Sequence, residues 1–215
     1  MKYTPTERTT VKRLPKRASY DKKIVQSILG EGMIAHVGLE TDTGVVVIPM
    51  AYGFDEFNIF LHGSPSSRLL RKSDSNQICV TVTVLDGLVL ARSLFHHSMN
   101  YRSVVIMGSA EKVDSDSEKE RALDLIVENI IPGRTEGTRP NSAKEIKSTT
   151  VIKLPINEVS AKIRTGPPVD DEEDYALKTW AGVIPIKMSF GEPEPDPLLE
   201  ESIEIPAHVS NLLTT

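Results

Sequence analysis

The chain has 215 residues, of which 39% are hydrophobic and 26% charged, the composition of an ordinary globular protein. Its one cysteine, Cys79, excludes an intrachain disulfide and a cysteine-based zinc site. No apolar run reaches the ~18 residues of a membrane span, and the N-terminus lacks the apolar core of a secretory signal. We therefore expect a cytoplasmic protein with no membrane partner.

The net charge of −5 is distributed unevenly. Residues 1–23 carry eight basic and two acidic side chains, whereas residues 166–215 carry two basic and eleven acidic ones. A basic segment can bind nucleic-acid phosphates. Residues 1–18 contain one aromatic side chain, Tyr3, and no base-reading motif, so we expect no nucleic-acid partner. The expected parts are a basic arm (1–18), one folded domain (19–190) and an acidic, proline-rich tail (191–215).

The domain begins with a predicted helix over residues 21–29, with Ser19 as its N-cap. Three strands are expected next, over residues 33–39, 45–52 and 57–62. The second of these is almost wholly apolar, so we expect it to be buried on both faces.

Ser64 followed by Pro65 predicts the start of a short helix that ends at Lys72. A β-branched strand follows over residues 77–85, continues over 88–92 after a bend at Gly87, and is succeeded by a strand over 101–113.

Two capping-box patterns, at Ser115 and Ser142, predict a long helix and a short one. Another strand, interrupted by Pro155, is expected over residues 149–164, and the acidic run from Asp170 predicts a helix that reaches Trp180. Most of the strands follow one another without helices between them. The expected fold class is therefore mainly β, an antiparallel barrel with peripheral helices.

The common catalytic sequence motifs are absent or only loosely matched. The run from Gly30 to Ala35 matches a loose dinucleotide fingerprint, but a helix precedes it and a strand follows, which reverses the required order. The sequence contains neither a P-loop nor the nucleophile elbow of a hydrolase. His62, His96 and His97 have no carboxylate nearby in the sequence, so we expect no metal site.

The most informative segment covers residues 62–72. A strand ends there at Gly63, where a glycine allows close approach of the backbone to a ligand, and a helix begins. Free N–H groups at the helix start would lie beside the hydroxyls of Ser64 and Ser67 and the cation of Arg68, which is the chemistry of an anion site. The alternative is a simple turn followed by a basic surface helix.

A second group of polar residues comprises Ser98 and residues 101–103. If this strand is half-buried, Tyr101 and Ser103 share one face and Arg102 takes the other. The only tryptophan, Trp180, is either a core residue or a stacking plane for a ring.

Four ordered stretches resemble the pyridoxamine 5′-phosphate oxidase-like FMN-binding split barrels. The resemblance is greatest to the branch of flavin-nucleotide-binding proteins and nitroimidazole-resistance (Nim) reductases. The stretches, which span about residues 15–190, are Ile48-Pro49-Met50-Ala51-Tyr52, Phe60-Leu61-His62-Gly63-Ser64 with Ser67-Arg68-Leu69, Tyr101-Arg102-Ser103-Val104-Val105 with Gly108-Ser109-Ala110, and Trp180-Ala181-Gly182-Val183-Ile184-Pro185.

The resemblance implies a six-stranded antiparallel split β-barrel that forms a homodimer, with FMN in the groove between the subunits. His62 would lie near the flavin and its small-molecule substrate, which makes it the candidate catalytic residue. By the same resemblance the backbone of residues 48–50 would lie along the flavin ring, and the flavin phosphate would lie near Ser64 and Arg68. The partner subunit would supply some of the other contacts. The flavin-binding residues implied in this way are Ile48, Pro49, Met50, His62, Gly63, Ser64, Ser67, Arg68, Ser98, Tyr101, Arg102, Ser103 and Trp180.

These features favour an FMN-dependent oxidoreductase that passes electrons from a reduced nicotinamide, NADH or NADPH, to a small acceptor. The alternatives are a flavin-binding module without turnover, and a groove that holds heme or a deazaflavin instead. Oxidation of pyridoxamine phosphate is not expected, because Leu69 stands where those oxidases carry a lysine and the acidic tail would repel a phosphate. We also expect the arm and the tail to contact each other or the partner subunit.

Overall fold

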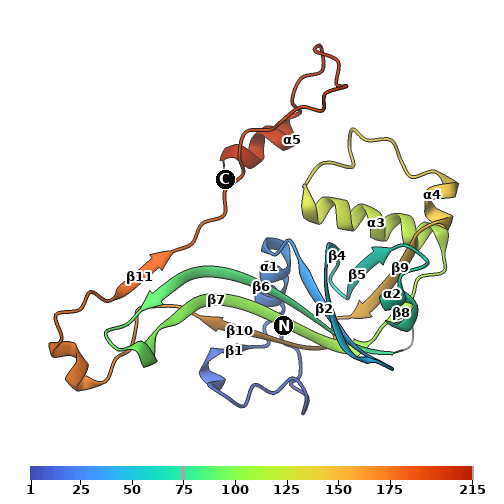
Figure 1. Cartoon of the computed structure of the whole chain (residues 1–215). Coiled ribbons are helices and arrows are strands. Elements are labelled where there is room, and N and C mark those ends of the chain that lie inside the picture. The colour runs from blue at the N-terminus through green and yellow to red at the C-terminus, as the bar shows by residue number, and fades with distance from the viewer. Residues whose placement is uncertain (74–75, 215) are drawn as a thin grey trace.

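The structure, a computed structural model, describes residues 1–73 and 76–214, without the side chains of Arg68, Leu69, Ser73 and Thr214. Within these residues the strands form two antiparallel sheets around an apolar core (Figure 1). The mainly β, antiparallel fold predicted from the sequence is confirmed. No helix in the described part of the chain is long and apolar enough to cross a membrane.

The first sheet carries the longest strands. Its order is β1 (Ala18–Ser19), β10 (Glu158–Arg164), β7 (Ser98–Ser109), β6 (Gln77–Leu90), β2 (Ala35–Thr41) and β3 (Gly44–Met50), and β11 (Gly182–Pro185) pairs with the end of β6. The pairing of β6 with β7 shifts between Leu85 and Gly87, where the sequence predicted a bend. The short 3-10 helix Leu94–His96 connects these two long strands.

The second sheet has the order β4 (Tyr52–Phe54), β5 (Asn58–Gly63), β9 (Thr150–Pro155) and β8 (Glu111–Lys112). Only Ala51 separates β3 from β4, so one stretch of chain runs from the edge of the first sheet to the edge of the second. The strand predicted over residues 149–164, with an interruption at Pro155, is divided at that point into two strands. A turn at residues 156–157 sends the chain from β9 in the second sheet to β10 in the first.

Alternate residues of the first sheet point into the core, where Val37, Val82 and Ile106 are almost completely buried. The helix α1 (Lys22–Glu31) buries Val25 and Leu29 against this core. Its N-cap is Asp21, whose carboxylate accepts hydrogen bonds from the backbone of Lys23 and Ile24, and not Ser19 as predicted. Ser19 belongs to the short strand β1, whereas Asp21 directly precedes the first helical residue, the position from which a side chain reaches those N–H groups.

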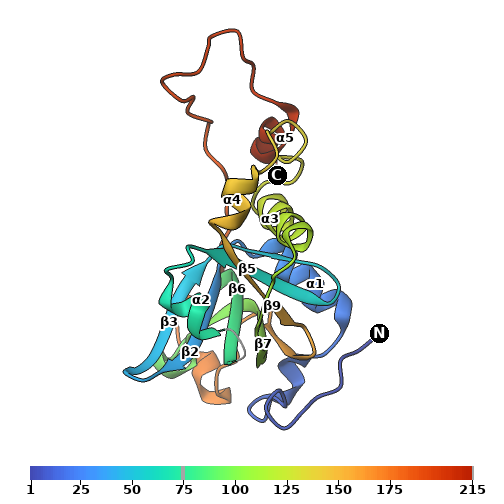
Figure 2. The same ribbon diagram turned by 90° about the vertical axis from the view of Figure 1, so that its right-hand side faces the viewer.

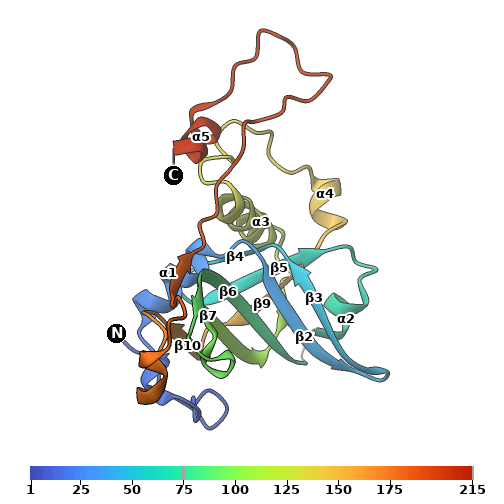
Figure 3. The same cartoon turned by 60° about the vertical axis from the view of Figure 1, so that its left-hand side comes forward.

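Two helices lie over the second sheet, α3 (Asp116–Ile130) and α4 (Ala143–Lys147) (Figure 2). Ser115 and Ser142 are their N-caps, as the capping-box patterns predicted. A Cβ atom built on Gly53 of β4 would lie 2.5 Å from the backbone nitrogen of Ile126. Because a glycine stands there, the backbone of α3 can rest directly on the sheet (Figure 3).

Two other helix predictions need correction. The helix α2 (Arg68–Ser73) is capped by Ser67, whose Oγ accepts from Leu70 N at 3.4 Å, because Ser64 is used in a tight turn before it. The acidic run forms only a short 3-10 helix, Glu172–Ala176, and does not continue to Trp180. Asp170 instead accepts hydrogen bonds from the backbone and the guanidinium of Arg92, at 2.9 and 3.0 Å.

The burial predicted for residues 45–52 was wrong for the part that forms β3. Val45 is 75% exposed and Val47 is 60% exposed. The strand is the edge of the first sheet, and its outward side chains lie on a face that the described chain leaves open. An apolar strand therefore lies exposed at the molecular surface.

The two ends of the chain behave differently. The arm, with a short 3-10 helix at Pro15–Arg17, lies along the domain, where Arg8 pairs with Glu158 and Tyr3 N donates to Tyr20 O at 2.8 Å. The tail leaves the sheets after β11, and its short helices α5 (Ala207–Ser210) and Asn211–Thr214 lie near the end of α3 (Figure 1).

Tyr52 links α1 to the second sheet, and we expect its hydroxyl to stabilise the fold. The hydroxyl is fully buried and lies 2.6 Å from the carbonyl oxygen of Leu29 and 2.8 Å from that of Gly32. Tyr52→Phe removes the donor to Leu29 O and leaves Gly32 O with the longer bond from Asn129 Nδ2 at 3.5 Å, so it should lower the free energy of unfolding by about 1–3 kcal/mol in urea titrations. Tyr175→Phe, at a half-exposed tyrosine, is the control and should change little.

Candidate functional site

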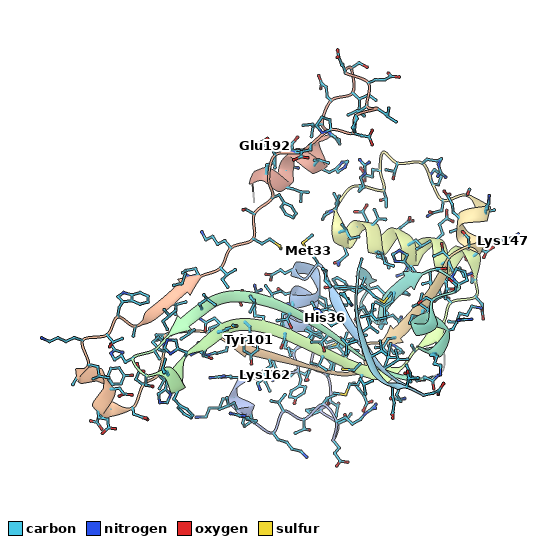
Figure 4. All side chains as sticks on the ribbon, in the orientation of Figure 1. Met33, His36, Tyr101, Lys147, Lys162 and Glu192 are labelled. Atoms are coloured by element: carbon cyan, nitrogen blue, oxygen red, sulfur yellow. The ribbon has the colours of Figure 1, made fainter. Side chains whose placement is uncertain are left out.

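The outward face of the first sheet carries an apolar surface with a shallow hollow of about 420 Å³. Its lining includes His36 on β2, Val45 and Val47 on β3, Cys79 on β6 and Met107 on β7. Figure 4 labels His36, together with Tyr101 of β7 and Lys162 of β10, along the same sheet. Exposed apolar patches of this kind mark contact surfaces for a ligand or another protein.

The first group of predicted flavin residues comprises residues 48–50 and the turn over residues 62–68. It lies where the chain crosses from one sheet to the other at Ala51. Tyr52 of β4 pairs with Leu61 of β5, and β3 ends at Met50, only two residues before Tyr52. The end of the predicted ring-binding segment, residues 48–50, therefore lies near the end of β5, where the predicted phosphate-binding turn begins. This proximity depends on the pairing of two strands that belong to the second sheet.

His62 lies half-buried at the end of β5. Its Nδ1 atom is buried and has no hydrogen-bond partner among the described residues. Burial lowers the pKa of the His62 imidazole below its usual value, because the charged form would lose its hydration. The ring is therefore neutral at pH 7 and able to accept or donate one hydrogen bond.

The turn after His62 is rich in hydroxyl groups. Ser64 Oγ lies 2.8 Å from Ser66 Oγ and accepts from Ser66 N at 3.2 Å. The side chain of Arg68, the predicted phosphate cation, lies outside the described residues. Lys72 at the end of α2 pairs with Asp42 of the β2–β3 turn, which ties α2 to the first sheet. The turn thus places hydroxyl groups just before a helix of only six residues.

The second predicted group lies three strands away, on β7. Tyr101 and Ser103 face outward and Arg102 faces the other side, as the strand pattern predicted. Because β2 and β6 separate β3 from β7, the spacing between strands alone puts this group at least about 14 Å from the ring-binding segment within one chain.

Arg102 is held by two carboxylates. Its guanidinium donates to Asp86 at 2.7 and 3.0 Å and to Glu31 at 2.5 Å, and these bonds raise its pKa. The side chain therefore connects β7 to the bulge of β6 and to the end of α1. Its assignment as a flavin contact stays a prediction.

Trp180 belongs with the β7 group. It precedes β11, and the pairing of β11 with β6 and of β6 with β7 aligns Val183 with Val89 and with Ser98. The indole is 66% exposed and rests on Gly182, where a Cβ atom would meet the ring at 3.0 Å. An exposed tryptophan beside an apolar face is available for stacking on a planar group.

Sequence reasoning did not single out Arg164, which pairs in register with Tyr101. Its side chain is almost completely buried and donates to Asn100 Oδ1 and to the carbonyl oxygen of Gly166. Burial is the main cause that lowers its pKa. The available sequence signal was a basic residue at the end of a predicted strand. In the structure Arg164 places a buried cation beside the second group.

The family described as pyridoxamine 5′-phosphate oxidase matches residues 21–163. The chain belongs to this family. The split-barrel fold predicted from the sequence is the fold of this family. No curated protein matches the chain.

Three solved structures are similar. The flavocytochrome Anf3 from Azotobacter vinelandii is 41% identical, covers 98% of each chain and superposes with a TM-score of 0.92. A FAD- and heme-binding protein from Mycobacterium smegmatis is 32% identical over 92% of this chain and 97% of its own, with a TM-score of 0.87. A protein from Bacteroides thetaiotaomicron assigned to 5-nitroimidazole antibiotic resistance is 25% identical over 68% of this chain and 86% of its own, with a TM-score of 0.56.

Because the pKa of His62 is lowered in the folded state, we expect the stability of the protein to depend on pH. In the folded state the pKa of the imidazole lies below its unfolded value of 6.5. The unfolded chain therefore takes up the proton first as the pH falls, so acid favours unfolding. Wild-type stability should therefore fall relative to that of His62→Asn as the pH drops below about 6.5, and the two should run parallel above it. Urea titrations at pH 5 to 8 measure this, with the exposed His97→Asn as control, and a constant difference would contradict it.

Proposed function

We propose that the chain is a flavin-dependent oxidoreductase that works as a homodimer, with the flavin between the subunits. One observation carries the proposal. The predicted flavin residues fall into two groups at separate places on or beside one open apolar face, and a second copy of the chain can bring the two groups together. The same second copy would cover Val45 and Val47, whose exposure costs free energy in a single chain.

The first group would hold the flavin ring and phosphate. The backbone of residues 48–50 would lie along the ring, and Ser64, Ser67 and Arg68 would hold the phosphate. From the partner copy, Tyr101, Ser103 and Trp180 would close the site. When bound, the flavin supplies the hydride and electron transfer. His62, neutral at pH 7, is suited to exchange a proton with the substrate.

These residues would contact the flavin ring and its first phosphate, which FMN and FAD have in common. The Mycobacterium smegmatis relative is named for FAD, so the mass of the released cofactor decides between the two. The same relative is also named for heme, and the Azotobacter vinelandii relative is a flavocytochrome. We therefore propose that this chain carries a heme together with the flavin, in place of the alternative in which heme replaces it.

The electron donor in this proposal is NADH or NADPH, and the acceptor is a small molecule. Purified protein should show flavin absorbance, and anaerobic mixing with the reduced nicotinamide should bleach it. Flavin that stays oxidised would instead identify a binding module without turnover. A colourless protein that cannot be reconstituted with FMN or FAD would contradict the proposal.

Arg68 tests the phosphate site. Arg68→Ala should weaken the binding of FMN by about tenfold or more, because a charge-assisted contact to phosphate contributes about 1.5–3 kcal/mol. The affinity for riboflavin, which has no phosphate, should not change. Fluorescence titration of the apoprotein measures both affinities. Equal losses for the two ligands would show that Arg68 does not contact the phosphate.

The exposed strand tests the dimer. Val47→Lys places a charge on the open face and should shift the protein toward a monomer in sedimentation velocity and lower its flavin content. Phe57→Lys is the matched control, since Phe57 is 64% exposed but lies at the β4–β5 turn. A Val47→Lys protein that sediments as the wild type would contradict the proposed interface.

A further inference from the structure

Two loops at one end of the first sheet carry an exposed apolar surface. The first is the β6–β7 loop (residues 93–97, the tip), and the second is the segment before β11 (residues 169–180, the strap). Leu94 and Phe95 of the tip are 94% and 88% exposed, and Leu177 of the strap is half exposed. An apolar surface as exposed as this one marks a contact with another molecule.

The tip and the strap are fastened to each other. His96 Nε2 lies 3.2 Å from a carboxylate oxygen of Asp171, and the guanidinium of Arg92, just before the tip, donates to Asp170 at 3.0 Å. The same guanidinium lies over the ring of Tyr175, 4.8 Å from its centre. The two loops therefore present their apolar side chains as one unit.

The strap is also strongly acidic. Residues 170–174 are all aspartate or glutamate, and the strap contains one lysine. The first two of these acidic residues have the partners just named, whereas Glu172, Glu173 and Asp174 form no ion pair in the described part of the chain. Unpaired carboxylates beside an apolar surface favour a partner that carries positive charge.

The complementary charge lies at the opposite end of the same chain. The helix α2 has three basic residues among its six and no acidic one, and its Arg71 is exposed and forms no ion pair with any described residue. This helix precedes β6, while the strap is bonded to Arg92 just after β6 ends. The 14 residues of β6 span about 40 Å. The strap and α2 therefore do not meet within one chain (Figure 1).

The proposed flavin site would bring these two segments together between copies. In that site Trp180, the last residue of the strap, closes over the partner copy, whose phosphate-binding turn at residues 64–67 leads directly into α2. The strap of one copy would then lie beside α2 of the other. Because two-fold symmetry repeats every contact, the dimer would contain two such pairs of segments.

The apolar surface also has a matching place beside α2. Lys72 of α2 pairs with Asp42 in the β2–β3 turn, and Val45, near the start of β3, is 75% exposed. One surface thus offers an exposed valine next to a basic helix. The other offers Leu94 and Phe95 next to an acidic strap, so the two surfaces are complementary in both hydrophobicity and charge.

We propose that the tip and the strap dock on α2 and the start of β3 of a second copy, with Glu172, Glu173 and Asp174 beside Arg71. This inference rests on the proposed function, because it names the surfaces that hold two copies around the flavin. The docked strap fixes the position of Trp180 at the partner's flavin. The strap therefore positions a residue of the site without itself touching the reacting atoms.

Two charge reversals test the contact, measured by sedimentation velocity over a range of concentrations at low ionic strength. Arg71→Glu, or Glu172→Lys combined with Glu173→Lys, places like charges in both contacts of the dimer and should raise its Kd at least about tenfold. An equimolar mixture of the two proteins should dimerise within about threefold of the wild-type Kd, since the mixed dimer has one native contact and one with both charges exchanged. The flavin content should fall and recover with the dimer.

Glu120→Lys combined with Glu136→Lys is the matched control, because both residues are exposed, lie outside the strap and change the net charge equally. This protein should keep the wild-type Kd. Either reversed protein with the wild-type Kd, or a mixture that dissociates like its components, would overturn the docking while a dimer sensitive to Val47→Lys still stands. A monomeric wild-type protein would overturn both.

Discussion

The open face of the first sheet is the constraint on which the rest of the structure depends. One side of this sheet packs on the core, where Val82 and Ile106 are buried, and the other side is left to solvent with Val45 and Val47 exposed. Within residues 1–73 and 76–214 no further element covers Val45 and Val47 on that side. The predicted flavin residues lie on or beside it, so the proposed dimer would cover the apolar face and complete the site with the same contact.

The crossing of the chain at Ala51 gives this face its first group of residues. Because β3 belongs to one sheet and β4 to the other, the ring-binding segment and the turn after His62 become neighbours. The core side of the crossing is tightly determined, since Gly53 admits the backbone of α3 and Tyr52 bonds to the end of α1. A rigid core thus presents a site at its edge, where a ligand or a partner can reach it.

The tail and the α3 loop form a separate structure outside this core. Glu128 fixes the loop by accepting a hydrogen bond from Gly133 N at 2.6 Å, and Gly133 packs against His208 of the tail. The loop thus gives the acidic tail a firm surface to rest on.

The sequence by itself determined features that depend on neighbours in the chain. The capping boxes at Ser115 and Ser142, the bend at Gly87 and the alternation of Tyr101, Arg102 and Ser103 all follow from local geometry. Tertiary structure decided the burial of residues 45–52, the division of residues 149–164 between two sheets and the environment of His208. An apolar pattern states that a strand needs cover but not whether the same chain provides it, and no local signal tells a histidine which distant loop will pack against it.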